Sequence, residues 1–249
     1  MKKQDSYRIL APYYDIFIDW NSRLQREIPF LQQVAGPASR GKRVLDMGCG
    51  TGHHLVALQE AGFRVEGTEP SEELRQIAQR NLKGVTIHAL PMESLEKLTK
   101  ALGPWHLIIC LGNTLAHLPP DKLPGFCLGL AGALDRQGAA VLHLLGYEKI
   151  MAERPEHLPP KNVVSGKDSY RFERCYNYRE DYIEFNIEVW KNEKRLACDQ
   201  EVLYPLTSRM LLAACKNAGL TDLRLFGAFD FLVPYSSRSD NLVAVIRKS

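Results

Sequence analysis

The chain has 249 residues, of which 45% are hydrophobic and 24% are charged, and its formal net charge at pH 7 is +3. This composition is that of an ordinary globular protein, and the length permits one large α/β domain or two small ones. No run of Lys or Arg reaches the roughly five to eight residues of a nucleic-acid-binding patch, and no apolar run approaches the roughly 18 residues of a membrane span. We therefore expect neither nucleic acid nor a membrane as a partner.

The cysteines and the first residues bear on the compartment and on metals. The six cysteines form no C-x-x-C pair and have no histidine cluster nearby; they are Cys49, Cys110, Cys127, Cys175, Cys198 and Cys215. Several lie in apolar runs, where a thiol behaves as a small hydrophobe. The first residues are polar and lack the apolar stretch of a signal peptide. These observations predict a cytoplasmic protein with reduced cysteines and no metal site.

In the first half of the chain, short apolar runs alternate with helical patterns. The pattern predicts five strands, at 43–47, 64–69, 85–89, 105–111 and 139–145. A helix is expected from about Thr51 to Ala61. Ser71 is expected to cap another helix, because Glu72 and Glu73 follow it in the first turn. Strands that alternate with such helices indicate β-α-β units in a parallel sheet, and their apolar character indicates a sheet covered on both faces.

The pattern changes after about residue 150. Pro155, Pro159 and Pro160 predict a loop. Residues 182–190 then alternate apolar and polar side chains, which is typical of a half-buried antiparallel strand. The strands expected to pair with it are at 169–178 and 195–204. A helix is expected at about 207–217, and a final strand at 242–246.

One strand of this antiparallel block carries aromatic side chains and an arginine on one face. These residues are Tyr170, Phe172, Arg174, Tyr176 and Tyr178. Aromatic rings interleaved with arginine can stack on nucleobases. Acidic residues in the same block dilute the positive charge, so we favour a packing face that also borders a substrate pocket.

A glycine-rich loop lies directly between the first strand and the first helix. In Gly48-x-Gly50-x-Gly52, glycine lets the backbone turn sharply and approach a ligand closely, and the helix N-terminus offers free N–H groups. A dinucleotide fingerprint would carry another glycine where this chain has His53. Glu69 ends the second strand about where an acid that bonds a ribose diol belongs. The loop and Glu69 together predict a nucleoside-binding site without choosing the cofactor.

Four segments carry a resemblance to a known family. Val44–Gly52 resembles motif I of the class I methyltransferases that use S-adenosylmethionine (SAM), and Gly67–Ser71 resembles their acidic second-strand motif. Ile109–Leu118 is similar to the motif after the fourth strand in small-molecule methyltransferases, including glycine/sarcosine N-methyltransferase-like proteins. Gly146–Ile150 resembles the Asn-Tyr-Asp motif that follows their fifth strand.

The resemblance implies the fold and the domain organisation. We expect a single class I methyltransferase domain over residues 1–249, of the α/β class. Its core would be a Rossmann-like, seven-stranded, mostly parallel sheet with helices on both faces. Lid helices are expected at about 1–40 and an antiparallel β insertion at about 151–205.

The resemblance also implies which residues bind SAM. They are Tyr14, Arg23, Asp46, Gly48, Gly50, Glu69, Pro70, Met92, Glu93, Leu111, Asn113 and His117. Arg23 would pair with the carboxylate of the cofactor. Two departures from the family pattern matter. Pro91 stands where many members carry an acid, so contacts to the adenine are assigned to Met92 and Glu93. Gly146 replaces the usual Asn, which weakens any inference of a glycine-type substrate.

Several of these residues also have a purely structural interpretation. Asp46 could hold the backbone of the glycine loop, Asn113 could be a turn residue, and His117 could cap a helix end. His53 and His54 are expected at the surface. His143 lies inside an apolar strand and is interpreted as a hydrogen-bonded core histidine.

The predicted activity is methyl transfer from SAM to an amine or hydroxyl group of a small molecule. A hydroxyl acceptor would need a general base, for which His117 and Tyr147 are candidates. The alternatives are an RNA or protein methyltransferase and a scaffold that binds SAM without turnover. No acidic cluster with metal-ligand spacing suggests a magnesium site.

Overall fold

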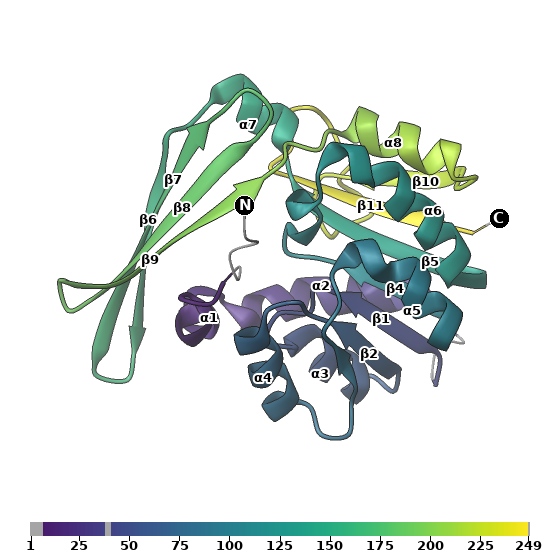
Figure 1. The fold of residues 1–249 in the computed structure, drawn as a ribbon, viewed down its shortest axis with the longest axis horizontal. Helices are drawn as coiled ribbons and strands as arrows, with labels where there is room; N and C mark the ends of the chain where they lie inside the picture. Colours follow the sequence, from purple (N-terminus) through teal and green to yellow (C-terminus); the bar gives the residue numbers. More distant parts are fainter. Residues whose placement is uncertain (1–6, 38–40, 249) are drawn as a thin grey trace.

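The computed structural model describes residues 7–37 and 41–248 and contains two sheets (Figure 1). The larger has seven strands in the order β10-β11-β5-β4-β1-β2-β3, and the smaller has four in the order β6-β7-β8-β9. The larger sheet comprises β1 (Arg43–Met47), β2 (Arg64–Thr68), β3 (Ile87–His88), β4 (Trp105–Cys110), β5 (Leu134–Leu145), β10 (Asp222–Phe226) and β11 (Asn241–Arg247). The two pairs that β11 forms, with β10 and with β5, are antiparallel, and the other neighbouring pairs of this sheet are parallel. The prediction of a mostly parallel seven-stranded sheet is therefore confirmed.

Helices cover both faces of the larger sheet, as predicted. One face packs against α2 (Trp20–Ala35), α3 (His53–Glu60) and α4 (Glu72–Asn81). The other packs against α5 (Leu95–Leu102), α6 (Leu123–Ala133) and α8 (Ser208–Asn217). Consecutive side chains of β4 point to opposite faces of the sheet. Leu107 and Ile109 pack on the side of α2, α3 and α4, and Ile108 packs on the side of α5, α6 and α8. This alternation explains why the strand is apolar throughout.

Local signals set several element boundaries. The Ser71 hydroxyl accepts a hydrogen bond from the backbone N–H of Leu74 at 3.4 Å, which confirms the predicted cap of α4. Thr207 caps α8 in the same way, through the N–H of Met210. Strand β3 is shorter than the expected 85–89, and β5 begins five residues earlier than the expected 139.

The smaller sheet is antiparallel and comprises β6 (His157–Ser165), β7 (Asp168–Tyr178), β8 (Ile183–Lys191) and β9 (Lys194–Leu203). The last three agree with the predicted strands to within about one residue. The expected loop around Pro159 and Pro160 was wrong, because these residues lie in β6. Proline is tolerated there because β6 is an edge strand whose register shifts between Leu158 and Lys161.

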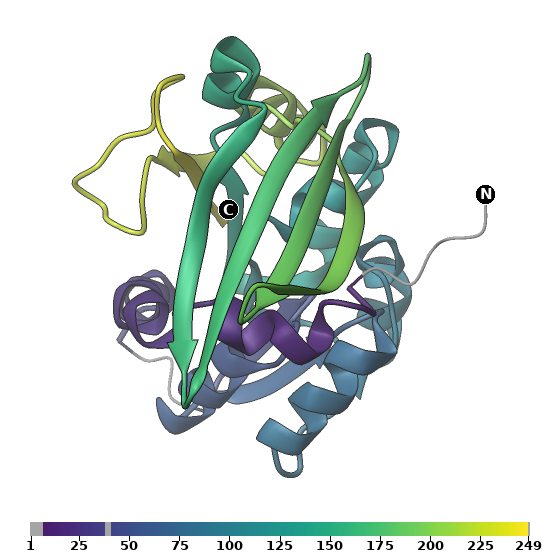
Figure 2. The ribbon, with the colours of Figure 1, turned by 90° about the vertical axis from the view of Figure 1, so that its left-hand side faces the viewer.

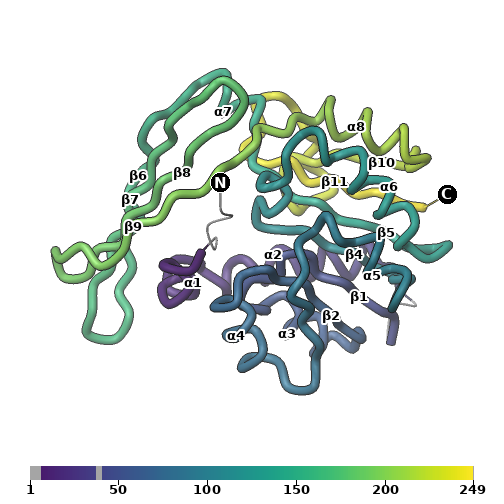
Figure 3. The backbone as a smooth tube through the Cα atoms, in the orientation of Figure 1, coloured from purple at the N-terminus to yellow at the C-terminus, as the bar shows by residue number. Residues whose placement is uncertain are grey.

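The smaller sheet stands to one side of the larger one, and α1 (Ala11–Phe17) lies against its inner face (Figure 2). The chain enters it after α7 (Tyr147–Glu153) and returns to α8 by a short connection (Figure 3). Of the segment expected to form lid helices, residues 1–6 and 38–40 lie outside the described residues. Among the helices of the described residues, none is both long and apolar enough to cross a membrane.

Candidate functional site

The chain order of the strands locates the site. After β1 the chain builds β2 and β3 on one side, then crosses to place β4 on the other side of β1. Open α/β sheets bind ligands at such a switch point, beyond the carboxyl ends of the strands. The glycine loop after β1 and residues 111–117 after β4 both lie at this edge.

The glycines of the loop are required by its geometry. Gly48, Gly50 and Gly52 have φ values of 71°, 56° and 84°, in the left-handed region that other residues rarely adopt. A Cβ atom on Gly48 would overlap the Thr114 side chain, and one on Gly50 would lie 3.7 Å from the Tyr14 ring. The loop is therefore enclosed between the turn after β4 and helix α1.

Helix α1 is tied to this loop by polar contacts. Asp15 accepts hydrogen bonds from the Thr51 hydroxyl at 2.7 Å and from Trp20 Nε1 at 2.9 Å. The Asp15 carboxylate also lies 3.2 Å from His53 Nε2, and the His53 ring stacks on Trp20. The segment expected to act as a lid thus contacts the loop that it was expected to cover.

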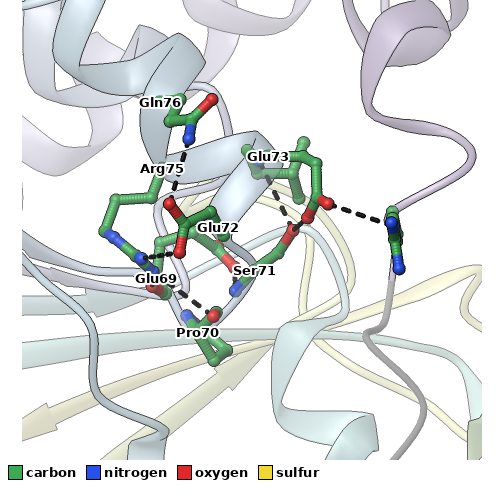
Figure 4. A network of polar contacts seen from close by, with 9 residues as sticks. Glu69, Pro70, Ser71, Glu72, Glu73, Arg75 and Gln76 are labelled. Carbon is green, nitrogen blue, oxygen red and sulfur yellow. Dashed lines mark hydrogen bonds and ion pairs between the residues drawn. The ribbon is translucent and has the colours of Figure 1, made fainter.

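Glu69 is buried at the end of β2, next to the loop. Its Oε2 atom accepts a hydrogen bond from the N–H of Gly50 at 2.9 Å, and Oε1 accepts one from the N–H of Ser71 at 2.8 Å. Figure 4 shows Glu69 with the first turn of α4, where Arg75 donates to the Glu69 carbonyl. Burial raises the pKa of Glu69, although its backbone hydrogen bonds oppose the shift. A carboxylate has about four acceptor positions, so Glu69 can also accept from the hydroxyl groups of a ribose.

Asp46 is a buried carboxylate at the end of β1. Its Oδ2 atom has no hydrogen-bond partner among the residues that the structure describes. Burial raises the pKa of Asp46 to about 8, although the charge of Arg23 opposes the shift. An unpaired buried carboxylate is costly unless it has a task, and an ammonium group would satisfy it. The residues at this edge therefore fit the amino acid portion of SAM, which carries an ammonium and a carboxylate.

Arg23 is held by the buried Glu27, which the sequence analysis missed, and Glu27 is held in turn by His54. Its Nε atom donates to Glu27 Oε1 at 2.9 Å, and His54 Nε2 donates to Glu27 Oε2 at 2.6 Å. Burial acts to raise the pKa of Glu27, but the hydrogen bond from His54 and the charge of Arg23 lower it overall. The expectation that His54 lies at the surface was wrong, because Glu27 draws it inward; it is 4% exposed. The spacing of Arg23 and Glu27 by four residues in a helix was the available signal.

The guanidinium of Arg23 lies against the turn after β4. A Cβ atom on Gly112 would be 3.0 Å from Arg23 Nη2. Since Glu27 engages Nε, the two terminal nitrogens face this turn. A planar pair of N–H donors in that position suits a carboxylate.

A cavity of about 1030 Å³ opens between this turn, helix α1 and the inner face of the smaller sheet. Arg23, Gly112 and Asn113 line one part of it. Aliphatic and charged side chains line it together with the aromatic rings of Tyr7, Tyr13, Tyr14, Phe17, Phe172, Tyr176, Phe185 and Phe229. The expected aromatic face of β7 thus borders a cavity: Phe172 packs on Phe17, and Tyr170 packs near Tyr13.

His117 lies behind the cavity wall. Its Nε2 atom is 3.1 Å from the Tyr7 hydroxyl, and its Nδ1 atom is 3.8 Å from Glu201 Oε2. Glu201 also accepts a hydrogen bond from the N–H of Tyr7 at 3.0 Å. Burial lowers the pKa of His117 to about 4, so its ring is neutral near pH 7. Nε2 can then accept the Tyr7 proton, and Tyr7 presents its ring to the cavity.

Asn113 and Tyr147 form a fixed pair below the cavity. Asn113 adopts φ of 69°, accepts a hydrogen bond from the N–H of Leu145 at 3.1 Å and donates to the Tyr147 hydroxyl at 2.9 Å. Tyr147 is fully buried, and burial raises its pKa. Tyr147 is not among the residues that line the cavity, and its hydroxyl accepts a hydrogen bond from Asn113. This arrangement favours a role in orienting Asn113 over the predicted role as a general base.

The remaining expected residues lie around the same edge. Leu111 is buried after β4, Pro70 and Glu93 are exposed, and Met92 is half-buried against the core near α5. His143 is a hydrogen-bonded core histidine, as predicted. It lies 3.2 Å from the N–H of Gly112, which donates to its Nδ1, and 3.0 Å from Asn241 Oδ1. Within the described ranges, no three acidic, histidine or cysteine side chains gather as a metal site would require.

Known proteins match this chain in sequence and in fold. Residues 44–138 match the family model described as a methyltransferase domain. The chain is 33% identical to the glycine/sarcosine N-methyltransferase of Halorhodospira halochloris over 142 residues, which are 55% of this chain and 52% of that protein. It is 32% identical to the ubiquinone biosynthesis O-methyltransferase of Bordetella avium over 108 residues, 41% of this chain and 43% of that protein. The chain therefore spans about half the length of the curated relatives that it matches.

Among solved structures, the sugar N-methyltransferase KedS8 from a Streptoalloteichus species is similar with a TM-score of 0.72 and 18% sequence identity. The superposition covers 98% of this chain and 93% of that one. At this level of identity the likeness shows the fold alone.

Proposed function

We propose that this chain, which matches a methyltransferase family model over residues 44–138 and is similar to a glycine/sarcosine N-methyltransferase, transfers the methyl group of SAM to an amine of a small molecule. The observation that carries this proposal is the aromatic cavity that opens next to Arg23, Gly112 and Asn113. In this proposal α1 and α2 form the lid, and strands β6 to β9 cover the acceptor within one domain.

The cofactor-binding residues are assigned by their chemistry. Arg23 pairs with the carboxylate of SAM, Asp46 accepts from its ammonium group, and Glu69 accepts from its ribose. Gly48 and Gly50 allow close approach of the backbone, and Tyr14 covers the loop.

Further contacts to the cofactor are proposed at the two ends of the site. Pro70, Met92 and Glu93 are assigned to the nucleoside end of the site, and Leu111 and Asn113 to the methionine end. His117, which lies behind Tyr7, is assigned to the acceptor side of the methionine end, without a direct contact to the cofactor. These assignments follow from the positions of the residues along the carboxyl edge of the sheet.

Bound SAM supplies a methyl group that is already activated by a positively charged sulfur. The protein must then hold the acceptor in line and exclude water. Positioning of this kind can contribute about 7–11 kcal/mol in well-oriented systems. Aromatic walls suit an amine because ring faces attract its partial or full positive charge.

A hydroxyl acceptor is the second candidate, and the Tyr7–His117 pair favours it. A hydroxyl must lose its proton during transfer, and neutral His117 behind Tyr7 could take that proton through the Tyr7 hydroxyl. The two named relatives methylate through different atoms according to their names, one at nitrogen and one at oxygen. Comparing labelled products from amine and hydroxyl acceptors would separate the two candidates.

The burial of an aromatic residue on β7 disfavours the alternative of an RNA methyltransferase. Phe172, in the middle of the aromatic face of β7, is fully buried against Phe17 of α1. Its ring is not available to stack on the bases of an external strand.

Titration calorimetry with S-adenosylhomocysteine tests the proposed cofactor site. We expect Arg23→Gln to weaken binding at least about tenfold, since hydrogen bonds between charged groups are worth about 1.5–3 kcal/mol. Arg80→Gln, an exposed arginine on α4, is the matched control. Absence of binding by the folded wild-type protein would contradict the proposal.

A further inference from the structure

Two cations lie side by side on the smaller sheet over Phe17 of α1, Lys161 on β6 and Arg174 on β7. These strands pair in an antiparallel hairpin, in which Lys161 is opposite Phe172. Both cations also lie over the ring of Phe17: Lys161 Nζ is 5.2 Å from the ring centroid, and Arg174 Cζ is 5.5 Å from it. Arg174 lines the cavity directly.

Neither cation has a carboxylate partner within 4.0 Å among the residues that the structure describes. Arg174 Nη2 donates to the Pro159 carbonyl at 2.7 Å, while its Nε atom is buried without a partner. Two other cations of the cavity wall have ion-pair partners, Glu27 for the Nε atom of Arg23 and Asp240 for Lys149, and Arg26 of the same wall is exposed.

The surroundings disfavour two unpaired positive charges. Burial lowers the pKa of Arg174, and burial together with the charge of Arg174 lowers the pKa of Lys161. Asp19 is the acid that opposes the second shift; its carboxylate accepts from the N–H and hydroxyl of Ser22 and forms no ion pair with Lys161 within 4.0 Å. Charges removed from water without a counter-ion are costly, so a site of this kind gains from an anion.

We propose that Arg174 and Lys161 bind an anionic group, a phosphate or a carboxylate, of the methyl acceptor. The inference rests on the proposed function and narrows its substrate class to an amine or alcohol that carries a negative charge. The planar guanidinium can bind two oxygens at once, and the ammonium adds a point charge beside it.

The placement of the charges gives the acceptor an orientation. The anionic group would lie near Phe17, at the smaller sheet, and the reacting atom near Gly112 and Asn113, where Arg23 also faces. Two acids of the described residues, Glu153 on α7 and Asp230 after β10, line the cavity without an ion pair. Both are exposed, and neither pairs with Lys161 or Arg174.

Calorimetry with inorganic pyrophosphate and with acetate tests this site, using the full chain with and without S-adenosylhomocysteine at constant ionic strength. We expect pyrophosphate or acetate to bind the wild type and Arg174→Gln to weaken that binding at least about tenfold. Lys161→Gln should weaken it by a smaller factor, because a lysine offers a single point charge. Lys167→Gln removes the same charge from the turn of the same hairpin and should bind as the wild type does.

The outcomes distinguish the class of anion, failure of the anion site and failure of the proposed function. Tighter binding of pyrophosphate indicates a phosphate-bearing acceptor, and tighter binding of acetate indicates a carboxylate-bearing one. Absence of binding by the wild type, or an equal effect in all three variants, would overturn the anion site. Unfolding temperatures of the variants show that each is folded. Failure to bind S-adenosylhomocysteine would instead defeat the proposed function, whatever the result with the anions.

Discussion

The Tyr7 hydroxyl lies 3.1 Å from His117 Nε2 and so joins the segment before α1 to the turn after β4, 110 residues away. Through this contact and the docking of α1 on the glycine loop, the segment before α1 places Tyr7 between the cavity and His117.

The first prediction concerns this pair. Tyr7→Phe and His117→Asn should each lower kcat, by up to about a hundredfold if proton removal limits the reaction, because general base catalysis typically contributes about 10²–10⁴-fold. The affinity for S-adenosylhomocysteine should change little. Tyr182→Phe, on the turn between β7 and β8, is the control. A loss of cofactor affinity with kcat unchanged would show that the pair serves only to hold the lid.

The second prediction concerns Asp46 and pH. Its pKa in the folded protein is about 8, well above the value of about 4 expected in the unfolded chain. The unfolded chain therefore binds fewer protons between these values, and the stability linked to protonated Asp46 is lost as the pH rises through 8. Between pH 7 and 9 the ligand-free protein should lose about 1 kcal/mol of unfolding free energy from this group.

Urea unfolding of the wild type and of Asp46→Asn at these two pH values measures the effect. The variant should show a flatter dependence on pH. Parallel curves for the two proteins would mean that Asp46 is already ionised at pH 7.

The third prediction concerns Glu27, which positions Arg23. In Glu27→Gln the charge that holds Arg23 Nε and His54 is lost, so Arg23 should sample other orientations. We expect the KM for SAM to rise about tenfold with a smaller change in kcat, since a contact made equally in the ground and transition states affects KM. Glu60→Gln, exposed at the end of α3, is the control. An unchanged KM in a folded variant would remove Glu27 from this role.

The fourth prediction separates two roles for Tyr147. If its hydroxyl only orients Asn113, Tyr147→Phe should lower kcat by less than about tenfold and leave the shape of the pH profile unchanged. If Tyr147 were the general base, activity should fall by about a hundredfold or more and one limb of the profile should disappear. Steady-state rates across the pH range decide between these results.

The fifth prediction concerns the glycine loop. Gly48→Ala combines an unfavourable positive φ with a clash against Thr114, whereas Gly84→Ala has a similar φ of 73° and no neighbour within 4 Å. Each should lose about 1–2 kcal/mol of stability from backbone strain. Only Gly48→Ala should also weaken the binding of S-adenosylhomocysteine. Equal binding by the two variants would argue against cofactor contact at this loop.

Features that depend on neighbours in the sequence could be predicted from it. The glycine loop, the Ser71 cap and the alternating strand β8 follow from local conformational preferences and periodicity. Strand β6 could not, because its prolines are acceptable only at the edge position that the fold gives it.

Features that depend on contacts between distant segments were missed or misassigned. His54 is buried and hydrogen-bonded to Glu27 of α2, and the Tyr147 hydroxyl accepts from Asn113, 34 residues away in the chain. Lys161 and Arg174 lie side by side because of the register of β6 against β7. That register shifts between Leu158 and Lys161, and the sequence pattern does not predict the shift.

The central claim is methyl transfer to a small molecule, and label transfer from methyl-tritiated SAM tests it most directly. The purified protein is incubated with a metabolite extract, and label is measured separately in small molecules, RNA and protein. The account predicts label in the small-molecule fraction, in a compound that an anion-exchange column retains, and none with Arg23→Gln at the same cofactor concentration. Label confined to RNA or protein, or no label from a protein that binds S-adenosylhomocysteine, would contradict it.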